Sequence, residues 1–486
     1  MPYTHGVYVQ ENPTSVIAPI TADSAVQVIV GTAPVNLLAD PASAFNKPLL
    51  ANTFAEAAAK VGYSDTFADY TLCESIDASF RVFNVAPLVL INVLDPATHK
   101  ESIAASLKTI TNNQVLISEE GILKAGLVVK NEEALVTYDI TDDYTLEFDA
   151  NGYLLLKVVV GGQVAIDAET KLSIAYDKLK PSLVDKDDII GSYTALTGVY
   201  AGLECVSQVY PKLELVPGLI LAPGWSHIPE VGTVLSAKCV AINGSFSANC
   251  VKDVDSTTTG VVEYSGVKAW KDTNSYTSKH DIVCWPMCKI GIKKYHMSAL
   301  MAALIAYTDA GNGGVPYVSP SNKRMGISGA ILDSGTEVFL DQLQANILNG
   351  GGICTVINLN GWRSWGNNTG IYPSSSDVKD RFIPVRRMFD WWGDSFILTY
   401  FQKVDSPLNK RLIEAVVDSE NIRANGYMAR YEIADARMEY NTADNPTTDL
   451  LNGKITFKQY LTPYPPTETI INVLEFDPAA LTAALE

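Results

Sequence analysis

The sequence predicts a large protein of several domains, part α/β and part α+β. Three observations support this fold class: a strand, a helix and a strand follow one another near the N-terminus, a strand-rich acidic stretch interrupts that pattern, and a helix followed by strands closes the chain. A chain of 486 residues has the length of about two to four domains and can bury several cores.

The first α/β segment lies within residues 25–94. Residues 25–31 form a nearly continuous apolar run closed by a glycine, which is typical of a buried strand. Residues 53–61 have helical composition, and residues 88–94 form a second buried-strand run. Their order predicts an α/β core.

The amino-acid composition changes near residue 100. Residues 131–150 contain seven acidic residues and no basic one, and residues 127–129 and 153–160 are rich in strand formers. We expect a small acidic β-rich domain, inserted into the core at residues 100–190. Core-like patterning resumes at Leu213, with a strand expected at 234–242 and a helix at 296–307.

The C-terminal third contains one strongly signalled helix. Ser406 is placed to cap it, Pro407 suits its first position, and Asn425-Gly426 is expected to end it. Residues 454–461 then alternate as a strand does, and Pro463 and Pro465-Pro466 favour an extended linker.

Both ends of the chain read as short strands set apart by prolines. Residues 6–11 stop at Asn12-Pro13, and residues 469–477 are closed by Pro478. The backbone edges of such strands need partners, either within the chain or in another copy through β-augmentation. The residues alone leave both alternatives open.

Charge and hydropathy limit the function classes. A net charge of −18 disfavours nucleic-acid binding, which needs clustered Lys and Arg. The sequence contains no run of eighteen apolar residues, so we do not expect membrane insertion. The N-terminus lacks the basic and apolar regions of a secretory signal, so we expect folding in a cytoplasm. Acidic and basic residues are equal in number within 351–460. The basic residues there could form a local basic surface for an acidic partner, or they could belong to an ordinary solvated surface. They include Arg381, Arg386, Arg387, Lys410 and Arg411.

The sequence offers no convincing catalytic, cofactor or metal site. Phosphate-loop, nucleophile-elbow and metal-helix motifs are absent. Cys284 and Cys288 are closely spaced, but His280 and His296 do not complete a zinc site, and buried thiols are the expected alternative. Ser226 and His227 are adjacent, and neighbours on a strand point to opposite faces. We therefore expect no enzyme.

Several segments, in order, resemble the sheath proteins of contractile phage tails and of contractile bacteriocin-type particles. The most specific is GICTVINLNGWRSWGNNT at residues 352–369; the others are HGVYVQE at 5–11, FNKPLL at 45–50, VPGL at 216–219, SPSNKRMGISG at 319–329 and the closing stretch 454–477. Residues 100–190 lie outside the resemblance.

The resemblance implies a fold and a division of the chain. The expected units are an N-terminal arm (1–20), a discontinuous core of subtilisin-like topology (21–99 and 191–350), the inserted domain (100–190), a C-terminal α+β domain (351–466) and a C-terminal arm (467–486). The implied protein is a non-enzymatic subunit that stacks in hexameric rings around an inner tube and contracts to drive the tube through a cell envelope. A static shell or surface-layer protein and a subtilisin-like hydrolase are the alternatives.

The resemblance also implies sites and partners. The arms would pair with neighbouring subunits through Val7, Tyr8, Val9 and Gln10 and through Ile470, Ile471, Asn472, Val473, Leu474, Glu475 and Phe476. The acceptor strand would carry Ile455, Phe457 and Gln459, and Lys410 and Arg411 would face the tube. The implied partners are copies of the chain, the tail tube protein, and baseplate and terminator proteins of a virion tail or contractile particle assembled in a bacterial cytoplasm, with no nucleic acid and no cofactor.

Overall fold

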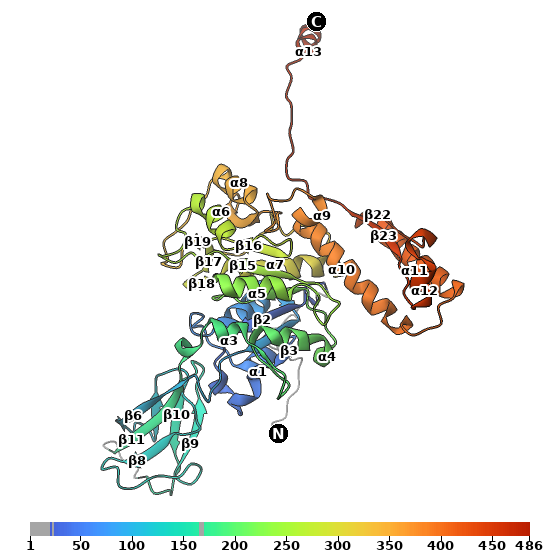
Figure 1. The fold of residues 1–486 in the computed structure, drawn as a ribbon. Helices are drawn as coiled ribbons and strands as arrows, with labels where there is room; N and C mark the ends of the chain where they lie inside the picture. Colours follow the sequence, from blue (N-terminus) through green and yellow to red (C-terminus); the bar gives the residue numbers. More distant parts are fainter. Residues whose placement is uncertain (1–19, 22–23, 165–169) are drawn as a thin grey trace, which may run out of the picture.

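A computed structural model describes residues 20–21, 24–164 and 170–486 of the chain (Figure 1). It is a mixed α/β protein of several units, which confirms the predicted fold class at that level. A large central sheet forms the body, a strand-rich unit projects at the lower left, and a helical unit lies at the right. The expected strand at residues 6–11 lies outside the described residues.

The body is built on an eight-stranded sheet. Its six central strands are parallel, and the two outer strands run antiparallel. In spatial order they are β21 (Trp362–Trp365), β20 (Ile353–Asn358), β16 (Asp281–Cys284), β15 (Asn249–Asp253), β14 (Leu219–Leu221), β2 (Gln27–Gly31), β5 (Leu88–Asn92) and β3 (Pro48–Ala51). The strands expected at 25–31 and 88–94 are confirmed as β2 and β5, both fully buried, as continuous apolar runs require.

Helices pack against this sheet. They are α1 (Phe54–Val61), α2 (Thr71–Asp77), α3 (Lys186–Ile190), α4 (Val209–Leu213), α5 (Pro229–Lys238), α6 (Tyr264–Thr273), α7 (Met297–Gly311) and α8 (Gln342–Gly350). The helices expected at 53–61 and 296–307 are confirmed as α1 and α7. The strand expected at 234–242 is wrong, because Pro229 starts a helix there whose Val231 and Leu235, one turn apart, reach the core.

Residues 100–164 and 170–179 form a β-rich unit with its own core. Two three-stranded sheets, β7-β10-β9 and β6-β11-β8, enclose buried side chains such as Ile117, Leu156 and Ile174. The strands are β6 (Lys100–Thr109), β7 (Gln114–Ile117), β8 (Val128–Asn131), β9 (Tyr144–Phe148), β10 (Leu154–Val158) and β11 (Lys171–Leu179). Burial alternates along β10, so one of its faces packs in this core and the other is more exposed.

Three smaller sheets complete the body. They contain β1 (Ile20–Thr21) with β4 (Val85–Ala86), β12 (Tyr193–Thr194) with β13 (Val199–Tyr200), and β18 (Lys293–Tyr295) with β17 (Met287–Ile290) and β19 (Gly329–Ile331). Cys284 and Cys288 lie buried in β16 and β17. None of the helices in the described residues is both long enough and apolar enough to cross a membrane.

The C-terminal unit consists of two long helices and a hairpin. Its elements are α9 (Val378–Arg381), α10 (Ile383–Tyr400), α11 (Lys410–Ala429), β22 (Ile433–Glu439), α12 (Thr447–Leu451) and β23 (Lys458–Pro463), followed by α13 (Pro478–Leu485) at the end of the chain. The expected boundary at residue 351 differs from the structure, because β20 and β21 extend the core sheet past it.

The helix expected after Ser406 begins later. Asn409 caps α11 by accepting a hydrogen bond from the Leu412 N–H at 3.0 Å, so Ser406 and Pro407 precede the helix. Asn425-Gly426 lies inside α11 instead of ending it, since Ala424 packs in the core beneath. Propensity at these positions is overridden by packing.

Candidate functional site

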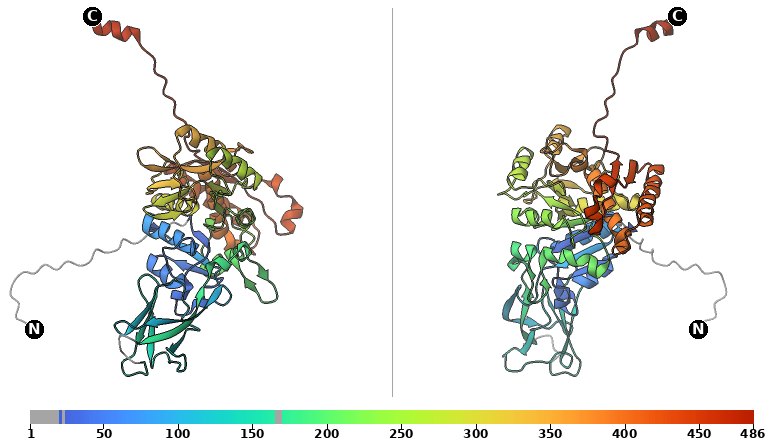
Figure 2. Two further views of the ribbon diagram at one scale, coloured as in Figure 1. Left: turned by 90° about the vertical axis from the view of Figure 1, so that its left-hand side faces the viewer. Right: turned by 45° about the vertical axis from the view of Figure 1, so that its right-hand side comes forward.

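The C-terminal arm, residues 467–486, stands away from the rest of the molecule (Figure 2). Its apolar side chains face solvent: Ile470 is 88% exposed, Leu474 87% and Phe476 78%. Asp477 caps α13 through the N–H groups of Ala479 and Ala480, and every residue of that helix is exposed. A folded chain rarely leaves so much contiguous apolar surface in water unless another molecule covers it.

The strand expected at 469–477 carries no strand assignment in the single chain. Within the described residues, no partner strand lies beside Ile470, Ile471, Asn472, Val473, Leu474, Glu475 or Phe476. The composition is that of a strand, but a strand exists only when a second backbone accepts and donates its hydrogen bonds. The expected pairing residues Val7, Tyr8, Val9 and Gln10 lie outside the described residues.

The root of the arm is fixed to the body by an ion pair. Glu468 and the Arg381 guanidinium lie 2.6 Å apart, and Arg381 also donates to the Asn368 side chain and covers the rings of Tyr372 and Phe382. This contact borders a groove of about 890 Å³ between α8, the β21 region and residues 464–470. The contact sets the place at which the arm leaves the body.

The β22–β23 hairpin lies beside the start of the arm. The strands are antiparallel, with Met438 opposite Gln459 and Ala436 opposite Leu461. Ala436 and Ile433 pack with Met388 and Trp392 of α10. A sheet of two strands has two outer edges, each able to accept another strand.

Of the three expected acceptor residues, only Gln459 lies in β23. Ile455 and Phe457 precede it, so the strand expected from residue 454 begins four residues later, at Lys458. The reason is local. The Asn445 side chain accepts a hydrogen bond from the Thr456 N–H at 2.7 Å and donates one to the Thr456 carbonyl at 2.8 Å. The backbone of Thr456 is therefore bonded to an amide side chain and not to the neighbouring strand β22.

A second asparagine side chain is hydrogen-bonded to the backbone of the β22 strand. Asn421 of α11 accepts from the Met438 N–H at 2.8 Å and donates to the Met438 carbonyl at 3.2 Å. Neither asparagine contact could be predicted from the sequence, because a single asparagine on a helix or in a loop carries no recognisable pattern. Only the distance across the fold shows what each amide contacts.

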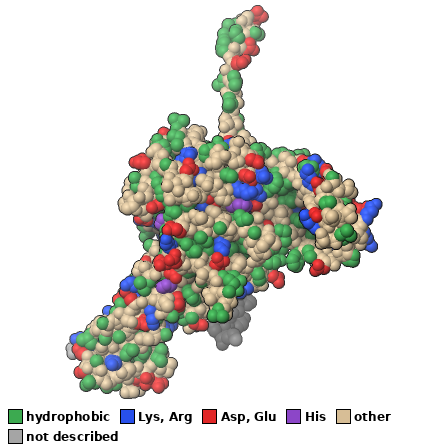
Figure 3. Space-filling model, in the orientation of Figure 1, with side chains coloured by type: hydrophobic (Ala, Val, Ile, Leu, Met, Phe, Trp, Pro, Cys, Tyr) green, Lys and Arg blue, Asp and Glu red, His purple; other side chains and the backbone are tan. Residues whose placement is uncertain are grey.

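The expected basic residues separate into two groups. Lys410 and Arg411 occupy the first turn of α11, where Lys410 is exposed and lies 3.4 Å from Glu414, and Figure 3 shows Lys and Arg at the right-hand end of the molecule. Arg386 and Arg387 are buried, so the interpretation of these two as surface residues is wrong. A buried guanidinium requires a carboxylate partner, and each has one.

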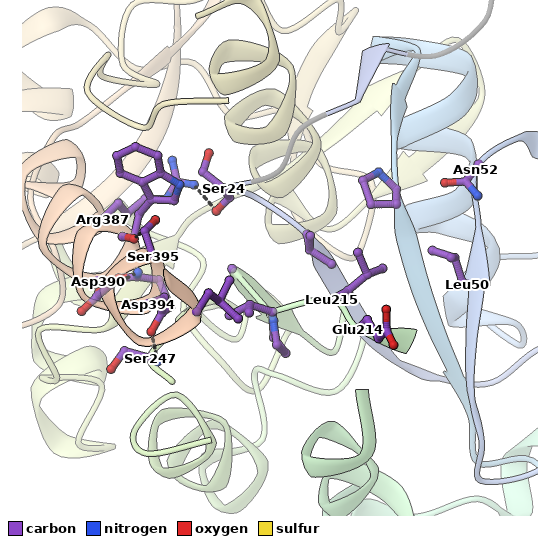
Figure 4. A pocket seen from close by; sticks show the side chains of 18 residues that line it. Ser24, Leu50, Asn52, Glu214, Leu215, Ser247, Arg387, Asp390, Asp394 and Ser395 are labelled. Carbon is purple, nitrogen blue, oxygen red and sulfur yellow. Dashed lines mark hydrogen bonds between the residues drawn. The ribbon is translucent and has the colours of Figure 1, made fainter. Parts of the chain in front are cut away.

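Arg387 joins α10 to the body beside a cavity of about 450 Å³ (Figure 4). Its guanidinium lies 2.6 Å from Asp309 and donates to the Ser24 carbonyl at 3.2 Å. On the same helix, Asp394 accepts from the Ser247 N–H at 3.0 Å, and burial raises the pKa of this carboxyl to about 7. These polar contacts hold the C-terminal unit against the core.

Ser226 and His227 do not form a nucleophile–base pair. The Ser226 hydroxyl is fully buried, donates to Asp253 at 3.1 Å and accepts from the Asp253 N–H at 3.0 Å. In the described part of the chain no hydrogen bond joins Ser226 to a histidine, and burial, followed by the neighbouring His296, lowers the pKa of His227. The arrangement is that of a satisfied core serine.

Comparison with curated proteins finds tail sheath proteins. The chain is 27% identical over 480 residues to the tail sheath protein of Burkholderia phage BcepMu, covering 96% of this chain and 95% of the relative. It is 25% identical over 415 residues to the tail sheath protein of Escherichia phage P2, covering 81% and 92%. The major tail sheath protein of Serratia phage KSP20 is 30% identical over 134 residues, which are 27% of this chain and 32% of the relative.

Solved structures share the fold at lower identity. A chain of the anti-feeding prophage baseplate superposes with a TM-score of 0.58 at 15% identity, covering 98% of this chain and all of that one. A chain of a contracted extracellular contractile injection system sheath gives 0.56 at 14%, covering 99% of each. No family-wide sequence profile matches the chain.

Proposed function

Because the chain belongs to the tail sheath family and is a structural subunit of a contractile tail sheath, we propose that it polymerises as stacked six-membered rings around an inner tube. The observation that carries this proposal is the C-terminal arm, whose exposed apolar side chains and unpaired backbone need a second copy of the chain. In this proposal the strand residues of both arms, 7–10 and 470–476, join neighbouring subunits.

The proposed contraction separates two kinds of contact. Backbone hydrogen bonds between the arms and neighbouring hairpins persist, while surface contacts between the bodies exchange as the rings rotate and widen. The extended, proline-containing linker at 464–466 allows this because it carries no hydrogen bonds of a regular element. The lower-energy contracted packing then drives the tube through the target envelope without a nucleotide or other cofactor.

The remaining partners follow from the same proposal. Lys410 and Arg411 face the tail tube protein, and baseplate and terminator proteins contact the two ends of the stack. The chain acts as a non-enzymatic component, assembled in the bacterial cytoplasm without binding nucleic acid. The proposed units are the arms 1–20 and 467–486, a core of 21–99 with 191–350 whose sheet β20 and β21 extend, an inserted domain at 100–190 and a C-terminal α+β domain within 351–466.

Electron microscopy of the purified chain and of truncated variants tests the proposal. The full chain is expected to form long tubes in two states that differ in diameter and helical pitch, and deletion of residues 467–486 or 1–15 is expected to abolish them. Tubes that survive both deletions would contradict the role of the arms. A polymer with a single diameter under all conditions would indicate a static shell.

A further inference from the structure

The cavity between α10 and the core has an apolar side and a polar side. Its volume of about 450 Å³ is in the range of cavities that enclose small organic ligands. Leu50 and Leu215 of the core line one side, and Asp390 and Asp394 of α10 line the other (Figure 4). A molecule that fills this cavity would therefore contact the core and the C-terminal unit together.

The polar side presents oxygen atoms that lack a donor. Asn249 lines the cavity and is only 2% exposed; its Nδ2 group donates to Asp390 at 3.1 Å, but its Oδ1 atom has no hydrogen-bond partner among the described residues. One oxygen of Asp394 accepts from the Ser247 N–H at 3.0 Å, and no donor in the described part of the chain bonds to the other. Buried acceptors normally have a donor, so a donor group is what this side of the cavity lacks.

These acceptors lie close together. Asp390 and Asp394 are one turn apart on α10, so their side chains project from the same face of the helix. The bond from Asn249 to Asp390 brings the unpaired amide oxygen to that face. Both carboxylates are buried, at 7% and 8% exposure. One ligand group can therefore meet the free oxygens of Asn249 and Asp394.

The charges around the cavity leave Asp394 without a cation. The Arg387 guanidinium is paired with Asp309 at 2.6 Å, and the Arg386 guanidinium is paired with Asp390 at 2.8 Å. Within residues 20–21, 24–164 and 170–486, no ion pair joins Asp394 to a Lys, Arg or His side chain. A buried carboxyl in this position either stays protonated or takes a cation from outside the chain.

Two further groups bear on this charge. Glu214 lines the cavity, is exposed and adds a second negative charge, while His280 lies 3.5 Å from Asp390 and does not line the cavity. Burial, together with the neighbouring Asp390, raises the pKa of Asp394 to about 7. A cation beside the carboxyl would lower this pKa and keep the carboxylate ionised.

These features select one class of ligand. An ammonium or guanidinium group supplies several N–H donors and a positive charge. An apolar stem attached to it gains free energy by leaving water for the side lined by Leu50 and Leu215. A neutral apolar molecule would leave the buried acceptors unpaired, and an anion would be repelled by Asp390 and Asp394.

We propose that this cavity binds a small organic cation, in which an ammonium or guanidinium group donates to Asp394 and Asn249 and an apolar stem lies against Leu50 and Leu215. The bound cation bridges α10 and the core and strengthens the attachment of the C-terminal unit. The inference goes beyond the proposed sheath function and does not depend on it, because every contact lies within one chain.

Isothermal titration calorimetry of the unassembled full-length chain tests the proposal, with hexylammonium as the probe. Hexan-1-ol, which has the same stem without the charge, and ammonium, which has the charge without the stem, are the matched controls. At pH 8 hexylammonium is expected to bind about tenfold or more tightly than either control. Equal affinity for hexylammonium and hexan-1-ol, or no saturable binding of hexylammonium, would overturn the inference.

The pH dependence identifies the carboxyl. Because the cation binds ionised Asp394, whose pKa is about 7, the affinity for hexylammonium should rise about tenfold from pH 6 to pH 8. Asp394→Asn can still accept from Ser247, and it should remove this rise and weaken hexylammonium binding at pH 8 about tenfold. Hexan-1-ol binding should not change. A pH dependence that persists in Asp394→Asn would show that another group binds the cation.

Two more variants complete the test. Asp418→Asn removes an exposed carboxylate of α11 that does not line the cavity, and its affinity for hexylammonium should equal that of the unsubstituted chain. Leu398→Trp places a larger side chain at a partly exposed lining position of α10, so it tests the cavity without altering a buried charge. It should weaken binding of hexylammonium and hexan-1-ol alike. Unchanged binding in folded Leu398→Trp, or an equal loss in Asp418→Asn and Asp394→Asn, would place the ligand elsewhere.

Discussion

In the core sheet, each strand from β3 to β21 finds its hydrogen-bond partners within the same chain, whereas residues 469–477 find none. The side chains follow the same division. Leu90 in β5 is fully buried, while Leu474 in the arm is almost fully exposed. The difference shows that one part of the chain is complete by itself and that another is completed by a neighbour.

The largest expected effect comes from the contact that holds α10 of the C-terminal unit to the core. Arg387→Ala leaves the Asp309 carboxylate buried without its cation, which should lower the free energy of unfolding by about 3–5 kcal/mol. Urea unfolding of unassembled protein measures this. Lys410→Ala is the control, since its exposed pair with Glu414 should contribute less than about 1 kcal/mol. Equal losses in both variants would show that Arg387 does not hold α10 to the core.

The next largest effect on the free energy of unfolding is expected from truncating a buried aliphatic side chain. Leu90→Ala should cost about 2–5 kcal/mol, because the packed sheet cannot close the cavity. The same substitution at Leu135, an exposed residue of the inserted unit, should change stability by less than about 0.5 kcal/mol. Calorimetry or urea unfolding compares the two. Similar values would mean that the core sheet is not tightly packed.

The pH dependence of stability should reveal Asp394. Its pKa in the folded chain is about 7, and an unfolded aspartate has a pKa of about 3.9. Between these values the folded state keeps a proton that the unfolded state has lost, so stability should fall as pH rises from about 4 to about 7. Asp394→Asn can still accept from Ser247 and should weaken this dependence. An identical pH profile in the variant would contradict the assignment.

The smallest effect on folding is expected in the arm. Leu474→Ser should change the unfolding free energy of the unassembled chain by less than about 0.5 kcal/mol, since the side chain contacts solvent. Its effect should be seen in assembly, as a large loss of sedimentable tubes. Leu135→Ser, which is similarly exposed but outside the arm, should assemble normally. Normal assembly of Leu474→Ser would separate the arm from polymerisation.

Local patterns predicted the elements whose type is signalled by their own residues. The apolar runs at β2 and β5 and the Thr53-capped helix α1 carry their own signals. The interpretation failed where packing outweighed propensity. Residues 234–238 belong to a helix that Pro229 begins, and Asn425-Gly426 stays helical because Ala424 packs below it.

The class of fold and the strand composition of the C-terminal arm could be predicted from the residues, because periodicity and turn residues act over a few positions. The family resemblance rested on motifs that occur in order along the chain. Only the folded chain shows that Arg387 is buried against Asp309, that Ser226 donates a hydrogen bond to Asp253 and that Asn421 accepts one from the Met438 N–H. Each of these contacts joins residues that are well separated along the chain. Their meaning depends on a distance that only the folded chain sets.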